Sequence, residues 1–223
     1  MATAPRTLLF VSAERPDRFD KAMATGADVV CIDLEDAVHP ERKDAARMAA
    51  IAYAQERSSD EVARPRLALR INPSRTLTGL RDVLAIADSG VRFDVLLLPK
   101  AESAQELVAV HEWLPDSFAA MVALIETPLG VEKANEIAAA VRHGATRLMA
   151  LMLGGADLSM ELGASFDWDA LYSARGRLVN AARSCGLQAW DVPFIDVADK
   201  AGLEQETRRV MGLGFDCRSA IAP

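Results

Sequence analysis

Cysteine is scarce in this sequence, and the few cysteines present argue against a structural metal site. Cys31, Cys185 and Cys217 are the only three among 223 residues, and they form no CxxC pair or Cys/His ligand spacing. A zinc site is therefore not expected, and the three are interpreted as reduced thiols in small core positions. Reduced cysteines are typical of cytoplasmic proteins.

Histidine is equally scarce. The three histidines, His39, His111 and His143, fall in predicted loops or helices rather than at the ends of predicted strands. Because protein zinc and iron sites commonly use imidazole ligands, neither metal is expected at the strand ends.

The sequence also lacks an excess of positive charge. It has 25 Lys and Arg against 32 Asp and Glu, which gives a formal net charge of −7. Nucleic acid is not expected as a partner, because binding phosphates requires a basic face. Small anionic substrates stay compatible with this charge, since an arginine or a metal ion can reverse the field inside a pocket.

Long apolar runs are missing as well. The N-terminal MATAPRTLLFV has too short an apolar run for a signal peptide, and no later segment approaches a membrane span. A cytoplasmic location without membrane contact is predicted.

What the sequence does contain is a regular alternation of short apolar runs and Ala-rich stretches, with no linker between them. The runs predict eight strands: TLLFV from Thr7, DVVCIDLE from Asp28, RLALRIN from Arg66, FDVLLLPK from Phe93, AMVALIE from Ala120, RLMALMLGG from Arg147, QAWDVPFID from Gln188 and FDCRSAI from Phe215. The stretches between them predict seven helices: Arg15–Thr25, Glu41–Arg57, Leu77–Asp88, Ala104–Trp113, Gly130–Arg142, Asp169–Cys185 and Asp199–Leu213. Four of these helices are predicted to stop at glycines, namely Gly26, Gly90, Gly144 and Gly214.

Strands that alternate with helices predict parallel pairing, and eight such units indicate a closed α/β fold, the parallel (β/α)8 TIM barrel. Residues 1–223 are predicted to form this single domain. An open doubly wound sheet is the rival, but it normally has a Gly-rich turn after its first strand, where this chain has SAERPDRF. The sequence stops at Ile221-Ala222-Pro223, so the barrel is expected to lack the helix after strand eight, by truncation or by closure through a partner.

Polar residues recur at the predicted carboxyl ends of the strands, where a TIM barrel builds its active site. They are Asp33, Glu35 and Asp36 after the second strand, Arg70 and Asn72 in the third, Lys100 after the fourth, Glu126 after the fifth, Gly154, Gly155, Ala156 and Asp157 after the sixth, and Asp191 and Asp196 in the seventh.

Strand alternation predicts which of these side chains enter the barrel mouth. Arg70 shares a face with Ala68, and Glu126 shares a face with Val122 and Leu124. A buried carboxylate requires a cation. Glu126 and Asp157 follow neighbouring strands, and two carboxylates with room for water suit Mg²⁺, which prefers oxygen ligands.

Simpler interpretations of each motif stay open at this point. DLED can be a solvated loop, Glu126 can form a structural ion pair with Lys100 or Arg70, Lys100 can extend to the rim, and LGGAD can be a tight turn. The combination favours a site, because five consecutive strands present charge at the same end.

Seven motifs carry a resemblance to a known family: RTLLFVSAERPDRF, ADVVCIDLEDAVHPERKDAAR, LALRIN, LLLPKAESAQEL, ALIETPLGV, LGGADLSMELG and GFDCRSAIAP. In order and spacing they resemble the citrate lyase β-subunit-like (CitE-like) family of the HpcH/HpaI aldolase group. The resemblance runs from about Arg6 to Pro223.

The resemblance implies a TIM barrel that uses Mg²⁺ to cleave or form a C–C bond in a 3-hydroxyacyl-CoA, such as citryl-, malyl- or citramalyl-CoA, with a keto-acid and an acyl-CoA as the products of cleavage. It also implies a homo-oligomer, often a trimer. It implies that Glu126 and Asp157 bind the metal, that Arg70 contacts the substrate, and that Glu35 and Asp36 are acidic groups beside the metal waters. It also implies that Arg15 and Arg18 contact the CoA phosphates, and that the backbone of Gly154, Gly155 and Ala156 contacts a keto-acid. Lys100 is a further candidate for substrate contact.

Two departures from the family pattern keep alternatives open. Relatives often end the eighth strand with an AIHP-like motif where this chain has Ala222, and longer relatives carry a C-terminal segment that covers a neighbouring subunit's site. The alternatives are a class II pyruvate aldolase without CoA, which the scarcity of histidine disfavours, and a non-catalytic keto-acid- or CoA-binding paralogue that needs a partner subunit.

Overall fold

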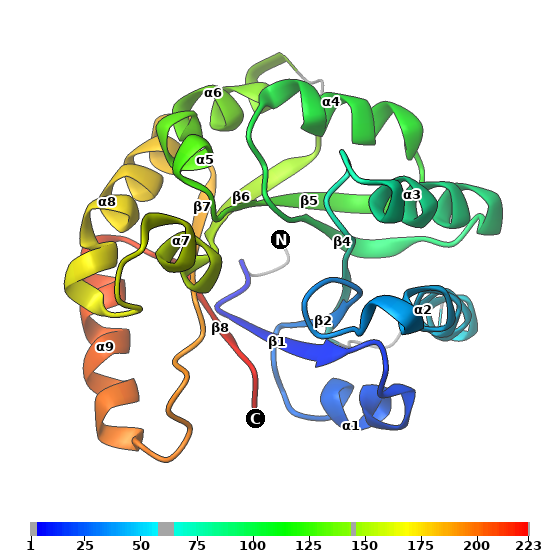
Figure 1. Ribbon diagram of the computed structural model, residues 1–223, viewed down its shortest axis with the longest axis horizontal. Coiled ribbons are helices and arrows are strands. Elements are labelled where there is room, and N and C mark those ends of the chain that lie inside the picture. Colours follow the sequence, from blue (N-terminus) through cyan, green and yellow to red (C-terminus); the bar gives the residue numbers. More distant parts are fainter. Residues whose placement is uncertain (1–3, 58–64, 144–145, 223) are drawn as a thin grey trace.

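Eight parallel strands close into a barrel in which each strand pairs with the next along the chain and β1 pairs with β8 (Figure 1). The computed structural model describes residues 4–57, 65–143 and 146–222. The strands are β1 (Thr7–Ser12), β2 (Val29–Asp33), β3 (Arg66–Arg70), β4 (Phe93–Leu98), β5 (Phe118–Ile125), β6 (Leu148–Leu153), β7 (Gln188–Asp191) and β8 (Cys217–Ala220). The predicted TIM barrel is confirmed.

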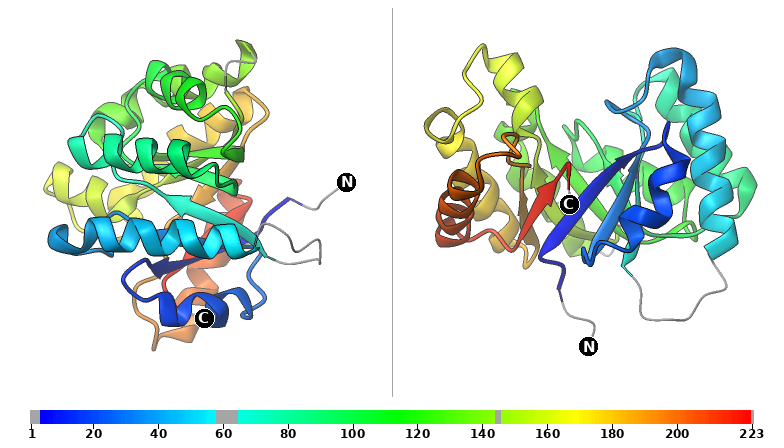
Figure 2. Two further views of the ribbon diagram at one scale, coloured as in Figure 1. Left: turned by 90° about the vertical axis from the view of Figure 1, so that its right-hand side faces the viewer. Right: turned by 90° about the horizontal axis from the view of Figure 1, so that it is seen from below.

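Helices surround the strands (Figure 2). Their bounds are α1 (Phe19–Met23), α2 (Lys43–Arg57), α3 (Leu77–Ser89), α4 (Ala104–Trp113), α5 (Pro128–Glu132), α6 (Ala134–Ala139), α7 (Gly155–Leu162), α8 (Trp168–Ser184) and α9 (Lys200–Leu213), with 3-10 turns η1 (Pro16–Arg18), η2 (Pro40–Arg42) and η3 (Ala140–His143). No helix of the described residues combines the length and hydropathy that a membrane crossing requires.

Three helical segments differ from the prediction. The first, predicted over Arg15–Thr25, divides into η1 and the short α1, and the predicted Gly130–Arg142 divides into α5, α6 and η3. Helix α7 lies where LGGAD was interpreted as a possible turn. The sequence did not predict this helix because Gly154 and Gly155 have low helix propensity. Gly26, Gly90 and Gly214 have positive φ and allow the predicted stops, whereas Gly144 lies outside the described residues.

The core has two layers that alternate along each strand. Ala68, Val122 and Leu124 lie in the inner cluster, which also contains the fully buried Trp190. Their strand neighbours, such as Leu69, lie in the outer cluster between the strands and the helices. This alternation confirms that the face carrying Arg70 and the face carrying Glu126 are turned into the barrel.

Aspartates tie strands together at the opposite, amino-terminal end of the barrel. Asp28 accepts hydrogen bonds from the N–H groups of Arg6 and Thr7, at 2.8 and 3.0 Å. Asp94 and Asp216 do the same for Leu67 and Ala189. Each carboxylate binds an N–H group at the start of the preceding strand, so these acidic residues serve the fold at the end away from the site.

Candidate functional site

A cavity of about 780 Å³ opens at the carboxyl ends of the strands, where TIM barrels place their active sites. Most of the residues that the sequence singles out for a site lie on its wall: Arg15, Arg18, Asp36, Arg70, Glu126, Gly154, Gly155, Ala156 and Asp157. Glu35 and Lys100 are not among the lining residues, but they contact its charged groups Arg70 and Asp157.

Glu126 follows β5 directly and is 2% exposed. The chain turns at once, because Thr127 accepts a hydrogen bond from Gly130 N and so caps α5, while Pro128 occupies the first helical turn. One carboxylate oxygen, Oε1, accepts a hydrogen bond from Lys100 N at 2.7 Å. The polar end of an apolar strand is thus placed at the floor of the cavity.

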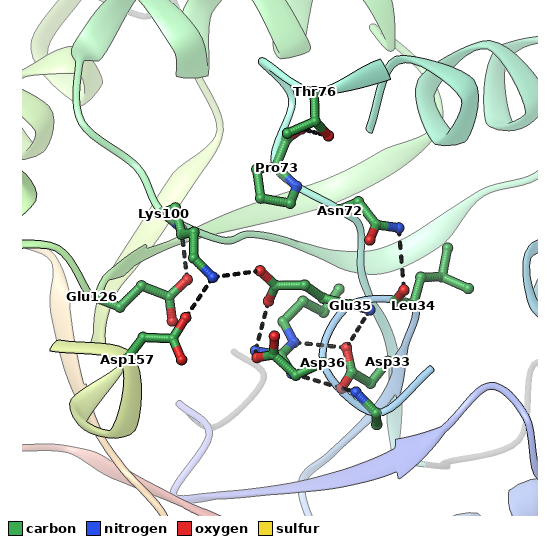
Figure 3. Close-up of polar contacts among 12 residues, drawn as sticks. Asp33, Leu34, Glu35, Asp36, Asn72, Pro73, Thr76, Lys100, Glu126 and Asp157 are labelled. Atoms are coloured by element: carbon green, nitrogen blue, oxygen red, sulfur yellow. Dashed lines mark hydrogen bonds and ion pairs between the residues drawn. The ribbon is translucent and has the colours of Figure 1, made fainter. Parts of the chain in front are cut away.

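Asp157 lies in the first turn of α7, the short helix that follows β6. Figure 3 shows its carboxylate beside that of Glu126, with both facing Lys100. Gly154 makes this proximity feasible, because a Cβ at that position would lie closer than 3.0 Å to Glu126 Cβ and Oε2. The two carboxylates that the sequence expects to converge do so.

Arg70, the last residue of β3, holds a group of carboxylates from the end of β2. Its Nε and Nη2 donate to the two oxygens of Asp33 at 2.7 and 2.6 Å, a bidentate pair between residues that are register partners. Its Nη1 lies 2.9 Å from Glu35 Oε2 and 3.2 Å from Asp36 Oδ2. The guanidinium also lies over the ring of Phe10, 5.1 Å from the ring centroid.

Lys100 connects the carboxylates around Arg70 with the Glu126 and Asp157 pair. Its Nζ donates to Asp157 Oδ2 at 2.5 Å and to Glu35 Oε1 at 3.2 Å (Figure 3). Its backbone φ is +52°, in the left-handed region that non-glycine residues seldom adopt. Such strain costs on the order of 1–3 kcal/mol and is found preferentially at functional sites.

Burial and like charge raise the pKa values of two buried carboxyls of the site, those of Glu126 and Glu35. For Glu126 burial is the main cause, and the negative charges of Glu35 and Asp157 add to it while Arg70 opposes it. For Glu35 burial again dominates, and Arg70 and Lys100 oppose the increase in pKa. Crowded carboxylates of this kind resist ionisation unless a further cation joins them.

A comparison with known families identifies the family to which this barrel belongs. The family model described as HpcH/HpaI aldolase/citrate lyase matches residues 6–223. This chain belongs to that family.

Curated members of the HpcH/HpaI family align with nearly the whole chain. A citrate lyase subunit beta-like protein of Mycobacterium tuberculosis is 36% identical over 96% of this chain and 74% of its own length. A (3S)-malyl-CoA thioesterase of Cereibacter sphaeroides is 34% identical over 98% of this chain and 73% of its own length.

Solved structures of the family superpose closely. The citrate lyase beta subunit of M. tuberculosis in complex with oxaloacetate and magnesium has a TM-score of 0.82 and 35% identity, and covers 99% of this chain and 93% of that one. CitE of the same organism in complex with magnesium, acetoacetate and coenzyme A has a TM-score of 0.81 and 36% identity, and covers 100% and 78%.

The donor set of this HpcH/HpaI family chain suits a hard cation such as Mg²⁺. Glu126 and Asp157 offer carboxylate oxygens, and the carboxyls of Glu126 and Glu35 have raised pKa values that an added positive charge would relieve. In the described part of the chain, no three His, Cys, Asp or Glu side chains are arranged to hold a metal. A metal held by Glu126 and Asp157 would take its remaining ligands from water or substrate oxygens.

Three polar residues predicted at strand ends lie outside the cavity. Asn72 binds Asp82 and accepts a hydrogen bond from Lys43 Nζ, since β3 ends at Arg70 and the alternation does not continue. Asp191 is fully buried and paired with Arg175 of α8, and Asp196 accepts N–H groups within an exposed loop.

Several residues on the cavity wall received no role from the sequence, Ser12 and Asp33 among them. Asp33 shares a face with Val29 and Cys31 of the inner cluster, so strand alternation could have placed it in the mouth beside Arg70. Ser12 at the end of β1 donates to Ala37 O at 2.5 Å, and no sequence signal distinguishes it from an ordinary serine.

Proposed function

We propose that this protein is a Mg²⁺-dependent carbon–carbon lyase that cleaves or forms a 3-hydroxyacyl-CoA, such as citryl-CoA, malyl-CoA or citramalyl-CoA. The products of cleavage are a keto-acid and an acyl-CoA. The observation that carries the proposal is the convergence of Glu126 and Asp157 at the mouth of a cavity that Arg70 also lines. The relatives described as citrate lyase beta subunits, bound to magnesium with oxaloacetate or with coenzyme A, support it.

Glu126 and Asp157 would hold the metal, which supplies Lewis-acid polarisation of the keto-acid oxygens when it is bound. Arg70 lines the cavity and would orient the substrate carboxylate or carbonyl. Asp33 occupies its Nε and Nη2, so the substrate would share Nη1 with Glu35 and Asp36. The first N–H groups of α7 at Gly155 and Ala156 line the cavity and have no acceptor within the helix, so they can donate to substrate oxygens.

Proton transfer is proposed for the acidic pair that follows β2. Cleavage requires a proton to leave the 3-hydroxyl group and another to reach the carbon released next to the thioester. Asp36 lines the cavity, where it could reach the substrate. Burial raises the pKa of the neighbouring Glu35 carboxyl, which favours its protonated form.

The wall near α1 is proposed to bind the coenzyme A moiety. Arg15 and Arg18 line the cavity there, and Arg15 is held by both oxygens of Asp17. Lys100, which contacts the Glu35 and Asp157 carboxylates beside the cavity, is proposed to take part in substrate binding. A homo-oligomer, a trimer or a multiple of it, and a cytoplasmic location complete the proposal.

Incubation with acetyl-CoA and a series of keto-acids, with and without Mg²⁺, tests the function directly. Glu126→Gln and Asp157→Asn are expected to lower kcat/KM by about 100-fold or more, because the metal loses a charged ligand. Glu132→Gln is the matched control, since Glu132 is an exposed residue of α5 that pairs with Arg177. Absence of both Mg²⁺ binding and any condensation or cleavage would refute the proposal.

Hydrolysis of the thioester is a second candidate, favoured by the similarity to a (3S)-malyl-CoA thioesterase. The two reactions differ in their products. A lyase releases acetyl-CoA and a keto-acid, whereas a thioesterase releases free coenzyme A and the hydroxy acid. Thiol titration together with chromatography of the CoA species distinguishes them in one assay.

A further inference from the structure

Lys100 places a positive charge among the carboxylates assigned to the metal. Its ammonium group donates to Asp157 Oδ2 at 2.5 Å and to Glu35 Oε1 at 3.2 Å, while its backbone N–H donates to Glu126 Oε1 at 2.7 Å. One residue thus contacts carboxylates that come from the ends of β2 and β5 and from α7.

The backbone of Lys100 is held in place from outside the site. Arg75 Nη1 donates to Lys100 O at 2.7 Å, and it is itself flanked by Glu106 Oε1 and Glu102 Oε2, both at 3.3 Å. These contacts hold the residue in its left-handed conformation at φ +52°. Since such a conformation is unfavourable for lysine, the surrounding contacts determine where the ammonium lies.

The ammonium and a divalent cation would compete for the Asp157 carboxylate. Lys100 already contacts Oδ2 of Asp157 and, through its backbone N–H, Oε1 of Glu126, the two residues proposed to hold the metal. Two cations a few ångströms apart repel strongly where solvent is partly excluded. The Lys100 side chain is 25% exposed and that of Asp157 is 23% exposed, so water screens this repulsion only in part.

We propose that Lys100 is an internal counter-ion that competes with the divalent cation for Asp157 and thereby weakens metal binding. This inference rests on the proposed metal site. The Lys100 ammonium keeps the Glu35 and Asp157 carboxylates paired and close together, and it releases Asp157 Oδ2 when a metal binds. The site is then assembled before the metal arrives, and the metal stays exchangeable.

Calorimetric titration with Mg²⁺ in the absence of substrate tests the competition. Lys100→Met is expected to lower the Kd for Mg²⁺ by about tenfold or more, because it removes a positive charge beside the site. Lys100→Arg retains the charge and is expected to keep the Kd near the wild-type value. Lys200→Met, an exposed lysine at the start of α9, is the control for loss of charge alone and is expected to change the Kd less than twofold.

Lys100→Asn is a second neutral variant, because asparagine tolerates positive φ better than methionine does. Thermal unfolding without metal shows whether each variant is folded, and both neutral variants are expected to gain more stability from saturating Mg²⁺ than the wild type gains. Unchanged or weaker Mg²⁺ binding in the folded neutral variants, with normal binding by the wild type, overturns the competition and leaves the proposed function intact. No Mg²⁺ binding by the wild type or by any variant overturns both.

Discussion

At the scale of the residue, Gly154 determines how closely β6 approaches Glu126. A Cβ on Gly154 would lie closer than 3.0 Å to Glu126 Cβ, an atom bonded directly to the backbone. Rotation of the Glu126 side chain therefore cannot relieve the collision, and the two backbones would have to separate. The absence of a side chain at position 154 is what lets the two proposed metal ligands meet.

Gly154→Ala is expected to weaken Mg²⁺ binding by about tenfold or more and to lower the free energy of unfolding by about 1–3 kcal/mol, since overpacking moves the backbone that carries Glu126. Calorimetry and urea denaturation measure the two effects. Gly176→Ala is the control in the interior of α8, where an added Cβ meets nothing within 4 Å. It is expected to raise stability by about 0.5–1 kcal/mol without affecting the metal. Wild-type Mg²⁺ affinity in Gly154→Ala would contradict the close approach.

At the scale of the element, Asp82 anchors α3 to its neighbours. It is fully buried, and its carboxylate accepts hydrogen bonds from Asn72 N at 2.8 Å, Asn72 Nδ2 at 2.7 Å and Arg47 Nε at 2.7 Å. These bonds join α3, α2 and the segment that follows Arg70. Removal of the carboxylate would leave the Arg47 guanidinium, which is 7% exposed, with the exposed Asp44 as its one charged partner among the residues that the structure describes.

Asp82→Ala is expected to lower the free energy of unfolding by about 3–5 kcal/mol, because one member of a buried ion pair is lost. Asp88→Ala, an exposed position on the same helix, is the control and should change stability by less than about 0.5 kcal/mol. Chemical denaturation of both variants gives the comparison. Equal stability of the two would show that α3 is held by its apolar contacts alone.

At the scale of the whole molecule, the proposed metal site unites distant parts of the barrel. Its charged residues come from the ends of β2, β3, β4 and β5 and from α7. The unfolded chain cannot present them together, so a cation that binds there binds the folded state alone. Metal binding and global stability are therefore linked.

Mg²⁺ is expected to raise the free energy of unfolding by about 2.7 kcal/mol when its concentration is 100 times its Kd. Asp157→Asn should lose most of this gain, because the site keeps one charged ligand. Thermal denaturation over a Mg²⁺ series, with NaCl added to hold the ionic strength constant, measures the effect. A midpoint that does not respond to Mg²⁺ in the wild type would argue against the site.

The features predicted from the sequence are those that depend on local pattern. The alternation of side chains along each strand correctly predicted that Arg70 and Glu126 face the barrel mouth. The alternation of strands with helices predicted the closed parallel barrel. The pairing of Arg70 with Asp33 was not predicted, because it depends on the register between β2 and β3. That residues 1–223 form one domain, and the role of each site residue, stay predictions.

By itself, therefore, the sequence determined the barrel, the end at which the charged strand-end residues gather and the side chains that face inward, because periodicity and strand ends are properties of short segments. Only the tertiary structure decided which charges pair. In the folded protein Arg70 pairs with Asp33, Arg175 pairs with Asp191, and Lys100 lies between Glu35 and Asp157. The reason is physical: an ion pair depends on distance in space, and these partners are brought together by barrel closure and helix packing rather than by neighbouring positions in the chain.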